Sequence, residues 1–304
     1  MSTGPVISEV GYVAIQVTDL EASERFALEA VGLFVTDRGE DYISFSHGQQ
    51  HHSLQYIHSD EDAFDHIGLK ARDAEALATV RSRVEEAGLK VVADGPLTPG
   101  IEDGFAFEGP DGFVIAVYTK MEKVDVPLPG AGVRPSRLQH ANFFAADHDA
   151  VRDLFIDILD FRVSDLIPGG TFMRCNVDHH GIGVFQGAGV LHHYAWEVPT
   201  AIELGQFADL IDARGGSVLW GPLRHGMGRN IATYVQEPSG LVVEYSADMQ
   251  RIYDDDTYVP GEWTMEGHKW YSLWGPQPLP DGFAELGLPP AKAVSARPRV
   301  GAAI

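Results

Sequence analysis

The side chains best able to do chemistry stand in the second half of the chain. His140, His193 and Glu244 each lie in a short run of β-forming residues, and alternate residues of a strand face the same side. Three neighbouring strands can therefore present two imidazoles and one carboxylate on their inward faces. This donor set leaves about three positions open on an octahedral ion, as in non-haem Fe(II) oxygenases. We predict a mononuclear metal site.

Strand parity extends this prediction to neighbouring residues. Asn142 is expected to share the inward face of His140, whereas His192, directly before His193, is expected to point the other way. Glu244 ends an apolar run, where a carboxylate is costly to bury unless it is paired or bound to a metal. A closed structural zinc site usually has four ligands, often cysteines, and this chain has only Cys175.

The chain also repeats itself. Four landmarks recur in the same order with offsets of about 126 to 128 residues, which is typical of a duplicated domain. The pairs are Gly11–Ile15 with Gln139–Phe143, His51-His52 with His179-His180, Gly95–Leu97 with Gly221–Leu223, and Gly109–Val114 with Glu237–Val242. The repeat allows each candidate ligand to be compared with its counterpart in the other copy.

Only the second copy has a full set of ligands. Tyr12, His66 and Ala116 stand where the second copy has His140, His193 and Glu244. Tyrosine, histidine and alanine together cannot hold a divalent ion tightly, so the first copy is predicted to have no metal site.

Both copies alternate β-rich runs with helical patterns and are assigned to the α+β class. Helices are expected at Leu20–Val31, Ala74–Ala87, Ala150–Leu159 and Ala201–Arg214. We place a first domain at residues 1–122 and a Pro- and Gly-rich linker at 123–136. A second, metal-binding domain follows at 137–250, and then an aromatic, Pro-rich tail at 251–304, which is expected to pack on the second domain or on a neighbouring subunit.

Composition excludes several functions. A net charge of −22 over 304 residues argues against nucleic-acid binding and against docking on anionic membranes. No apolar run approaches the roughly 20 residues that span a bilayer, and the amino terminus shows no secretory signal. A single cysteine fits a reducing compartment, so a cytoplasmic protein is expected.

The most specific pattern lies near the end of the second copy. His225 is followed nine residues later by Tyr234, then by a Pro-x-Gly turn at 238–240, and Glu244 lies ten residues beyond the tyrosine. These spacings resemble the type I extradiol catechol dioxygenases of the vicinal oxygen chelate superfamily, over residues 8 to 250. The resemblance implies paired βαβββ modules that form an open, barrel-like sheet in each domain, and a metal-free first copy.

The resemblance also implies a reaction and its residues. Fe(II), less often Mn(II), would be bound by His140, His193 and Glu244, and both atoms of O₂ would be inserted into an aromatic 1,2-diol beside its hydroxyls. His180, in preference to His179, would serve the O₂ side, and His225 and Tyr234 the diol. A homo-oligomer is also implied, while the diol itself stays open.

Other functions are compatible with the same fold. A metal-dependent glyoxalase-like isomerase usually has a fourth protein ligand, and Ala116 stands where it is expected. A 4-hydroxyphenylpyruvate-type dioxygenase lacks the pair formed by His225 and Tyr234. A non-catalytic protein that binds a drug or aromatic ligand typically loses the metal residues. Arg224 and Arg229 are candidates to meet a charged substituent, or are ordinary surface residues.

Overall fold

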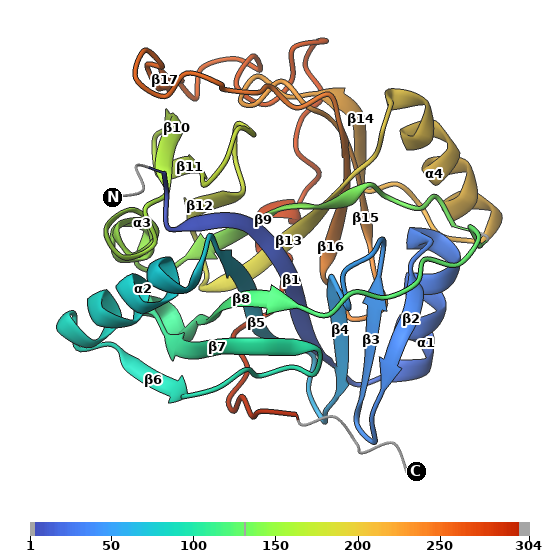
Figure 1. The fold of residues 1–304 in the computed structure, drawn as a ribbon. Helices are drawn as coiled ribbons and strands as arrows, with labels where there is room; N and C mark the ends of the chain where they lie inside the picture. Colours follow the sequence, from blue (N-terminus) through green and yellow to red (C-terminus); the bar gives the residue numbers. More distant parts are fainter. Residues whose placement is uncertain (1–3, 131, 298–304) are drawn as a thin grey trace.

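Two mixed β-sheets form the body of the protein. The computed structural model describes residues 4–130 and 132–297, and over these residues the strand orders are β2-β3-β4-β1-β5-β8-β7-β6 and β14-β15-β16-β13-β9-β12-β11-β10-β17. Each sheet is built from two strand–helix–strand units, in agreement with the expected α+β class and tandem domains (Figure 1). Residues 1–3, 131 and 298–304, which belong to the predicted first domain, linker and tail, lie outside the described residues.

The first copy contains the elements that run from residue 7 to residue 121. Its strands are β1 Ile7–Val17, β2 Phe34–Arg38, β3 Tyr42–Ser46, β4 Leu54–His58, β5 Ala63–Ala71, β6 Lys90–Ala93, β7 Ile101–Glu108 and β8 Val114–Met121. Its helical segments are α1 Leu20–Arg25, η1 Phe26–Val31, α2 Ala74–Glu86 and the short turn η2 Pro110–Gly112. Strands β2 and β6 lie at the two ends of the sheet and are partly exposed.

The second copy repeats this order. Its strands are β9 Arg137–Ala145, β10 Arg162–Ile167, β11 Gly170–Arg174, β12 Ile182–Gln186, β13 Val190–Glu197, β14 Trp220–Arg224, β15 Ile231–Gln236 and β16 Val242–Ala247. Its helical segments are α3 His148–Asp153, η3 Leu154–Ile158 and α4 Ala201–Ala213; the tail adds β17 Gly261–Glu262 and η4 Phe283–Glu285.

The first helix of each copy begins and ends in the same way. Asp19 and Asp147 accept a hydrogen bond from the backbone N–H three residues later, as an N-cap does. After two turns both helices widen into π-helical segments, η1 and η3. The helices expected at Leu20–Val31 and Ala150–Leu159 are therefore present, and the π-helical geometry of their second halves was not predicted.

An apolar core joins the two copies. Buried aromatic rings from both copies meet there: Phe113 and Phe143 have centroids 4.8 Å apart, and Phe64 lies 5.8 Å from Phe143. Burial of this many aromatic rings stabilises the pair of domains as one unit. None of the described helices has the length and apolar character needed to cross a membrane.

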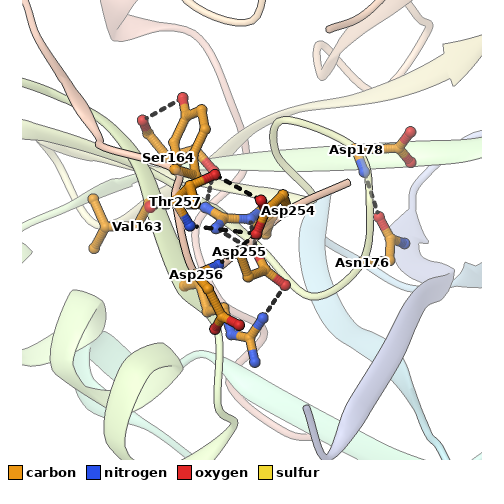
Figure 2. A network of polar contacts seen from close by, with 11 residues as sticks. Val163, Ser164, Asn176, Asp178, Asp254, Asp255, Asp256 and Thr257 are labelled. Atoms are coloured by element: carbon orange, nitrogen blue, oxygen red, sulfur yellow. Dashed lines mark hydrogen bonds and ion pairs between the residues drawn. The ribbon is translucent and has the colours of Figure 1, made fainter. Parts of the chain in front are cut away.

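The tail is fastened first to the second copy. Figure 2 shows Asp255 among the polar groups of β10 and β11, where it pairs with Arg162 and with the buried guanidinium of Arg174. Tyr258 donates a hydrogen bond from its hydroxyl to the carbonyl of Ser164, and β17 then pairs with β10. These contacts hold the start of the tail beside the sheet that carries the candidate ligands.

The tail later crosses both copies. Leu288 forms an isolated bridge with Leu191 at the start of β13, and Pro290 does the same with Phe64 at the start of β5. Gly287 is suited to this approach because its φ is +120° and an added Cβ would lie 2.5 Å from the carbonyl oxygen of Leu191. The tail is thus an integral part of the fold and contacts corresponding points of the two domains.

Candidate metal centre

The three predicted ligands come together on adjacent strands. His140 lies on β9, His193 on β13 and Glu244 on β16, and these strands are neighbours in the sheet. Nε2 of His140 lies 3.1 Å from Oε2 of Glu244, and Nε2 of His193 lies 3.2 Å from the same oxygen. One ligand atom from each residue lies within 4.8 Å of the others, and all three side chains are buried.

The electrostatics of this cluster suit a cation. Burial opposes the charged form of Glu244, but His140 and His193 together hold its pKa well below the usual range. Burial lowers the pKa of His193, so this imidazole is neutral and can offer a lone pair. Two imidazoles and one carboxylate form a donor set that fits a divalent ion with open positions.

Two asparagines form hydrogen bonds with the candidate ligands, and neither was predicted as a site residue. Asn230 donates from Nδ2 to Oε1 of Glu244 at 2.9 Å, on the side away from the histidines. Nδ2 of Asn142 lies 2.9 Å from Nε2 of His193. Because an amide N–H can only donate, this contact requires a lone pair on that nitrogen. The sequence indicated only Asn142, because it lies two residues after His140 and therefore on the same face of the strand.

The ligands line a cavity of about 290 Å³. Its other walls are largely aromatic and include Phe144, Phe172, Phe185, Trp220, Trp270 and Phe283. No lysine or arginine is among the described residues that line it, and Glu244 is the one acidic side chain there. Several wall residues, such as Trp270 and Phe283, belong to the tail.

His180 lies on the cavity wall and His179 lies behind it. The ring centroid of His180 is 4.4 Å from that of His140 and 4.9 Å from that of Phe172. Nδ1 of His180 lies 3.0 Å from Nδ1 of His179, whose Nε2 lies 3.1 Å from a carboxylate oxygen of Asp165. Burial holds the pKa of His180 well below its ordinary value. Of the two adjacent histidines, His180 is the one that faces the ligands.

His225 and Tyr234 form a pair on the opposite wall. Tyr234 faces Glu244 across the β15–β16 ladder. Nε2 of His225 lies 2.7 Å from the Tyr234 hydroxyl, and its Nδ1 lies 2.9 Å from the carbonyl oxygen of Tyr271. The carbonyl can only accept, so Nδ1 carries the proton and Nε2 accepts from the tyrosine. Burial lowers the pKa of His225 and raises that of Tyr234 well above 10.

The expected orientation of His192 was wrong. In the antiparallel pairing of β13 with β9, Leu191 faces Phe143 and His193 faces Asn142, so His192 is an extra residue on its strand. Such a β-bulge changes the direction of the side chain, and His192 lines the same cavity as His193. Alternation along a sequence does not reveal a bulge, because the bulge exists only relative to the partner strand.

Other candidates lie away from the cavity. Arg224 forms an ion pair with Asp248 and donates to the backbone carbonyl of Arg229, and neither arginine lines the cavity. Arg224 is therefore paired at the surface, and neither arginine is among the residues that line the cavity.

The corresponding position of the first copy is filled by protein atoms. The Tyr12 hydroxyl lies 3.0 Å from Nε2 of His66, and Nδ1 of His66 lies 2.6 Å from the carboxylate of Asp65. Within the described residues, His140, His193 and Glu244 form the one group of three or more potential ligands at this spacing.

The family model for the Glyoxalase/Bleomycin resistance protein/Dioxygenase superfamily matches twice, over residues 9–117 and 137–245. The chain therefore belongs to this superfamily and contains two copies of its domain. The vicinal oxygen chelate fold expected from the sequence is confirmed.

The relatives are aromatic-diol dioxygenases. The chain is 26% identical to the manganese-dependent 2,3-dihydroxybiphenyl 1,2-dioxygenase of Geobacillus genomosp. 3, over 91% of this chain and 96% of that protein. It is 27% identical to metapyrocatechase 2 of Cupriavidus necator, over 91% of each.

Solved structures show the same architecture over nearly the whole length. The Mn(II)-bound glyoxalase from Novosphingobium aromaticivorans superposes with a TM-score of 0.84 at 27% identity, over 96% of each chain. The homoprotocatechuate 2,3-dioxygenase of Brevibacterium fuscum, in complex with 3,4-dihydroxyphenylacetate, has a TM-score of 0.85 at 22% identity, over 94% of this chain and 93% of that one. At that lower identity the second likeness concerns the fold alone.

Proposed function

We propose that this protein is an extradiol dioxygenase that cleaves a catechol-type aromatic diol beside its hydroxyls with O₂. The observation that carries the proposal is the convergence of His140, His193 and Glu244 at one wall of a cavity lined largely by aromatic rings. A divalent ion held there, Fe(II) or Mn(II), would acidify the diol hydroxyls and bring diol and O₂ together. Both oxygen atoms enter the product, so no external reductant is needed.

The residues around the ligands have distinct tasks in this proposal. Tyr234 and His225 form a proton path, because the tyrosine can accept a diol proton as its own passes to Nε2 of His225. His180, on the other wall, would exchange a proton with the oxygen that adds to the ring. The aromatic walls exclude water, which would compete for the open positions of the metal.

The charge of the cavity favours an uncharged diol with an apolar substituent. A substrate carboxylate would leave water for a site lined by aromatic rings, with Glu244 as the acidic group and no lysine or arginine among the lining residues described. Burial of an unpaired charge is strongly unfavourable. A second ring or an alkyl chain would instead gain the hydrophobic contacts that the walls offer.

A matched pair of substrates tests this specificity. The iron- or manganese-loaded protein is assayed with 3,4-dihydroxyphenylacetate and, separately, with its methyl ester. O₂ uptake and formation of the yellow ring-opened product measure the reaction. We expect kcat/KM for the ester to exceed that for the acid by at least about 100-fold. Equal values would contradict the specificity but not the reaction. Absence of O₂ uptake with these and with 2,3-dihydroxybiphenyl and catechol would contradict the reaction itself.

A glyoxalase-like isomerase is the second candidate, and the likeness to the Mn(II)-bound glyoxalase favours it. An isomerase consumes no O₂. Anaerobic incubation of the metal-loaded protein with a hemithioacetal of glutathione, followed at the absorbance of the thioester, separates the two functions. We expect no anaerobic conversion, because the described ligand group has three protein donors and Ala116 supplies no fourth.

A further inference from the structure

His192 contacts both the candidate ligand His193 and the tail. Its Nδ1 lies 2.7 Å from Nδ1 of His193, and its Nε2 lies 2.8 Å from the carbonyl oxygen of Phe283. The ring is held between Phe144 and Phe283, with centroid distances of 4.6 and 4.9 Å. His192 is buried, so these two hydrogen bonds and the ring contacts determine its orientation.

The carbonyl of Phe283 decides which nitrogen carries the proton. A carbonyl oxygen only accepts, so Nε2 of His192 must donate to it. In a neutral imidazole the other nitrogen is then an acceptor, and Nδ1 of His193 must donate to it. The opposite assignment would place two lone pairs against each other at 2.8 Å, between Nε2 of His192 and the carbonyl.

We propose that His192 is a positioning residue for the metal: through the Phe283 carbonyl and its own Nδ1, it holds His193 as the Nδ1–H tautomer and keeps the lone pair of Nε2 directed at Glu244 and His140. The inference rests on the proposed metal site and not on the reaction catalysed there. The tail then has a second role besides lining the cavity. Its Phe283 carbonyl determines which nitrogen of His192 carries the proton, and His192 in turn determines the tautomer of His193.

The first copy supports this assignment independently. In the pairing of β5 with β1, Asp65 is the bulged residue, just as His192 is in β13. Its carboxylate accepts from Nδ1 of His66 at 2.6 Å, and the Tyr12 hydroxyl lies 3.0 Å from Nε2. Both copies therefore place an acceptor at the bulge for the histidine that follows, as histidine ligands of metals commonly require.

The direct test observes the protons in the wild-type protein. Nitrogen-15 NMR of histidine-labelled, metal-free protein distinguishes the two neutral tautomers, with signals assigned from single-histidine variants. We expect Nε2–H for His192 and Nδ1–H for His193. The Nδ1–H form of His192 would overturn the proposal whether or not the protein binds a metal.

Metal affinity provides the second test, with Mn(II) as the probe and the EPR signal of the free ion as the measure. We expect His192→Phe, which keeps the aromatic packing, to weaken Mn(II) binding about 10- to 100-fold. His192→Asn keeps an acceptor at the place of Nδ1 and should recover most of the affinity. Unchanged affinity in His192→Phe would overturn the proposal. Failure of the wild type to bind Mn(II) or Fe(II) would instead contradict the metal site.

A matched control comes from the first copy. His52 is buried, and its Nδ1 lies 2.9 Å from Nδ1 of His51. His52→Phe therefore removes the same kind of contact far from the ligands. We expect it to lower the thermal stability of the metal-free protein without changing Mn(II) affinity. A loss of affinity equal to that of His192→Phe would show that the effect is general destabilisation and would overturn the proposal.

Discussion

The two copies of the domain have the same strand register around their centres but fill them differently. In the second copy His140 faces Ala195 across the sheet, and in the first Tyr12 faces Gly68. An added Cβ at Gly68 would lie 1.9 Å from the Tyr12 ring, so the glycine makes room for the larger side chain. The Tyr12 hydroxyl donates to the Nε2 lone pair of His66, which is the lone pair that a metal would otherwise use.

The comparison separates what the fold requires from what the metal requires. Both copies keep the histidine, the bulge before it and a tail residue bridged to the strand just ahead of the bulge. They differ at the other two ligand positions, where the first copy has Tyr12 and Ala116. The bulge and the buried histidine therefore belong to the shared fold, and the other two candidate ligands, His140 and Glu244, are side chains added to it.

Removal of the carboxylate is expected to have the largest effect. Glu244→Ala takes away the one charged ligand, and we expect Mn(II) or Fe(II) affinity to fall at least about 1,000-fold, which corresponds to about 4 kcal/mol. His66→Ala is the matched change in the first copy. It should leave the metal affinity unaltered while destabilising the fold, because the buried carboxylate of Asp65 loses one of its hydrogen bonds. Equal effects of the two substitutions on metal binding would break the comparison.

Conversion of the first copy into a metal site is expected to have the next largest effect. Tyr12→His combined with Ala116→Glu restores the donor types of the second copy around His66. We expect the number of bound Mn(II) ions to rise from one to two per chain, by equilibrium dialysis, and the metal-free variant to melt earlier because burial of a further carboxylate is unfavourable. Tyr12→Phe, which adds no ligand, should keep one ion. If Tyr12→Phe also bound a second Mn(II) ion, that ion would lie somewhere other than beside His66.

The convergence of His140, His193 and Glu244 could be predicted from the sequence because the duplication supplied a comparison. His140 and Glu244 can ligate a metal where the other copy has Tyr12 and Ala116, and their spacing to His225 and Tyr234 is distinctive. The role of the tail could not be predicted, since residues such as Phe283 follow no period. His192 was placed on the wrong face because parity assumes an unbroken strand, and a bulge is visible only when the partner strand is known.

Displacement of the tail is expected to have a moderate effect. Gly287→Ala places a Cβ 2.5 Å from the carbonyl of Leu191 at a positive φ, and we expect a loss of about 2 to 4 kcal/mol in the free energy of unfolding. Gly275→Ala has a similar φ of +133° but nothing within 4 Å, so it carries only the conformational cost. Mn(II) affinity should fall several-fold in Gly287→Ala alone. Equal stability of the two variants in urea would show that the tail yields easily there.

The smallest effect concerns a corner where the copies meet. Glu237 accepts hydrogen bonds from the hydroxyls of Tyr56, in the first copy, and Tyr194. Its counterpart Gly109 has no side chain, and an added Cβ there would lie 2.8 Å from Leu154. One corner is therefore joined by a buried carboxylate and the other by close apolar packing.

Burial raises the pKa of Glu237 above its ordinary 4.5, while the hydroxyls that donate to it oppose the rise. The folded state then binds more protons than the unfolded state from about pH 4.5 up to the raised pKa. Relative to Glu237→Gln, the free energy of unfolding of the wild type should fall as pH rises through this window. Urea unfolding of both proteins between about pH 4 and pH 8 measures the difference. Tyr56→Phe should raise the pKa of Glu237 further and extend the decline in the free energy of unfolding to higher pH. A difference between wild type and Glu237→Gln that does not vary with pH would show that the carboxylate is charged throughout, like an ordinary surface carboxylate.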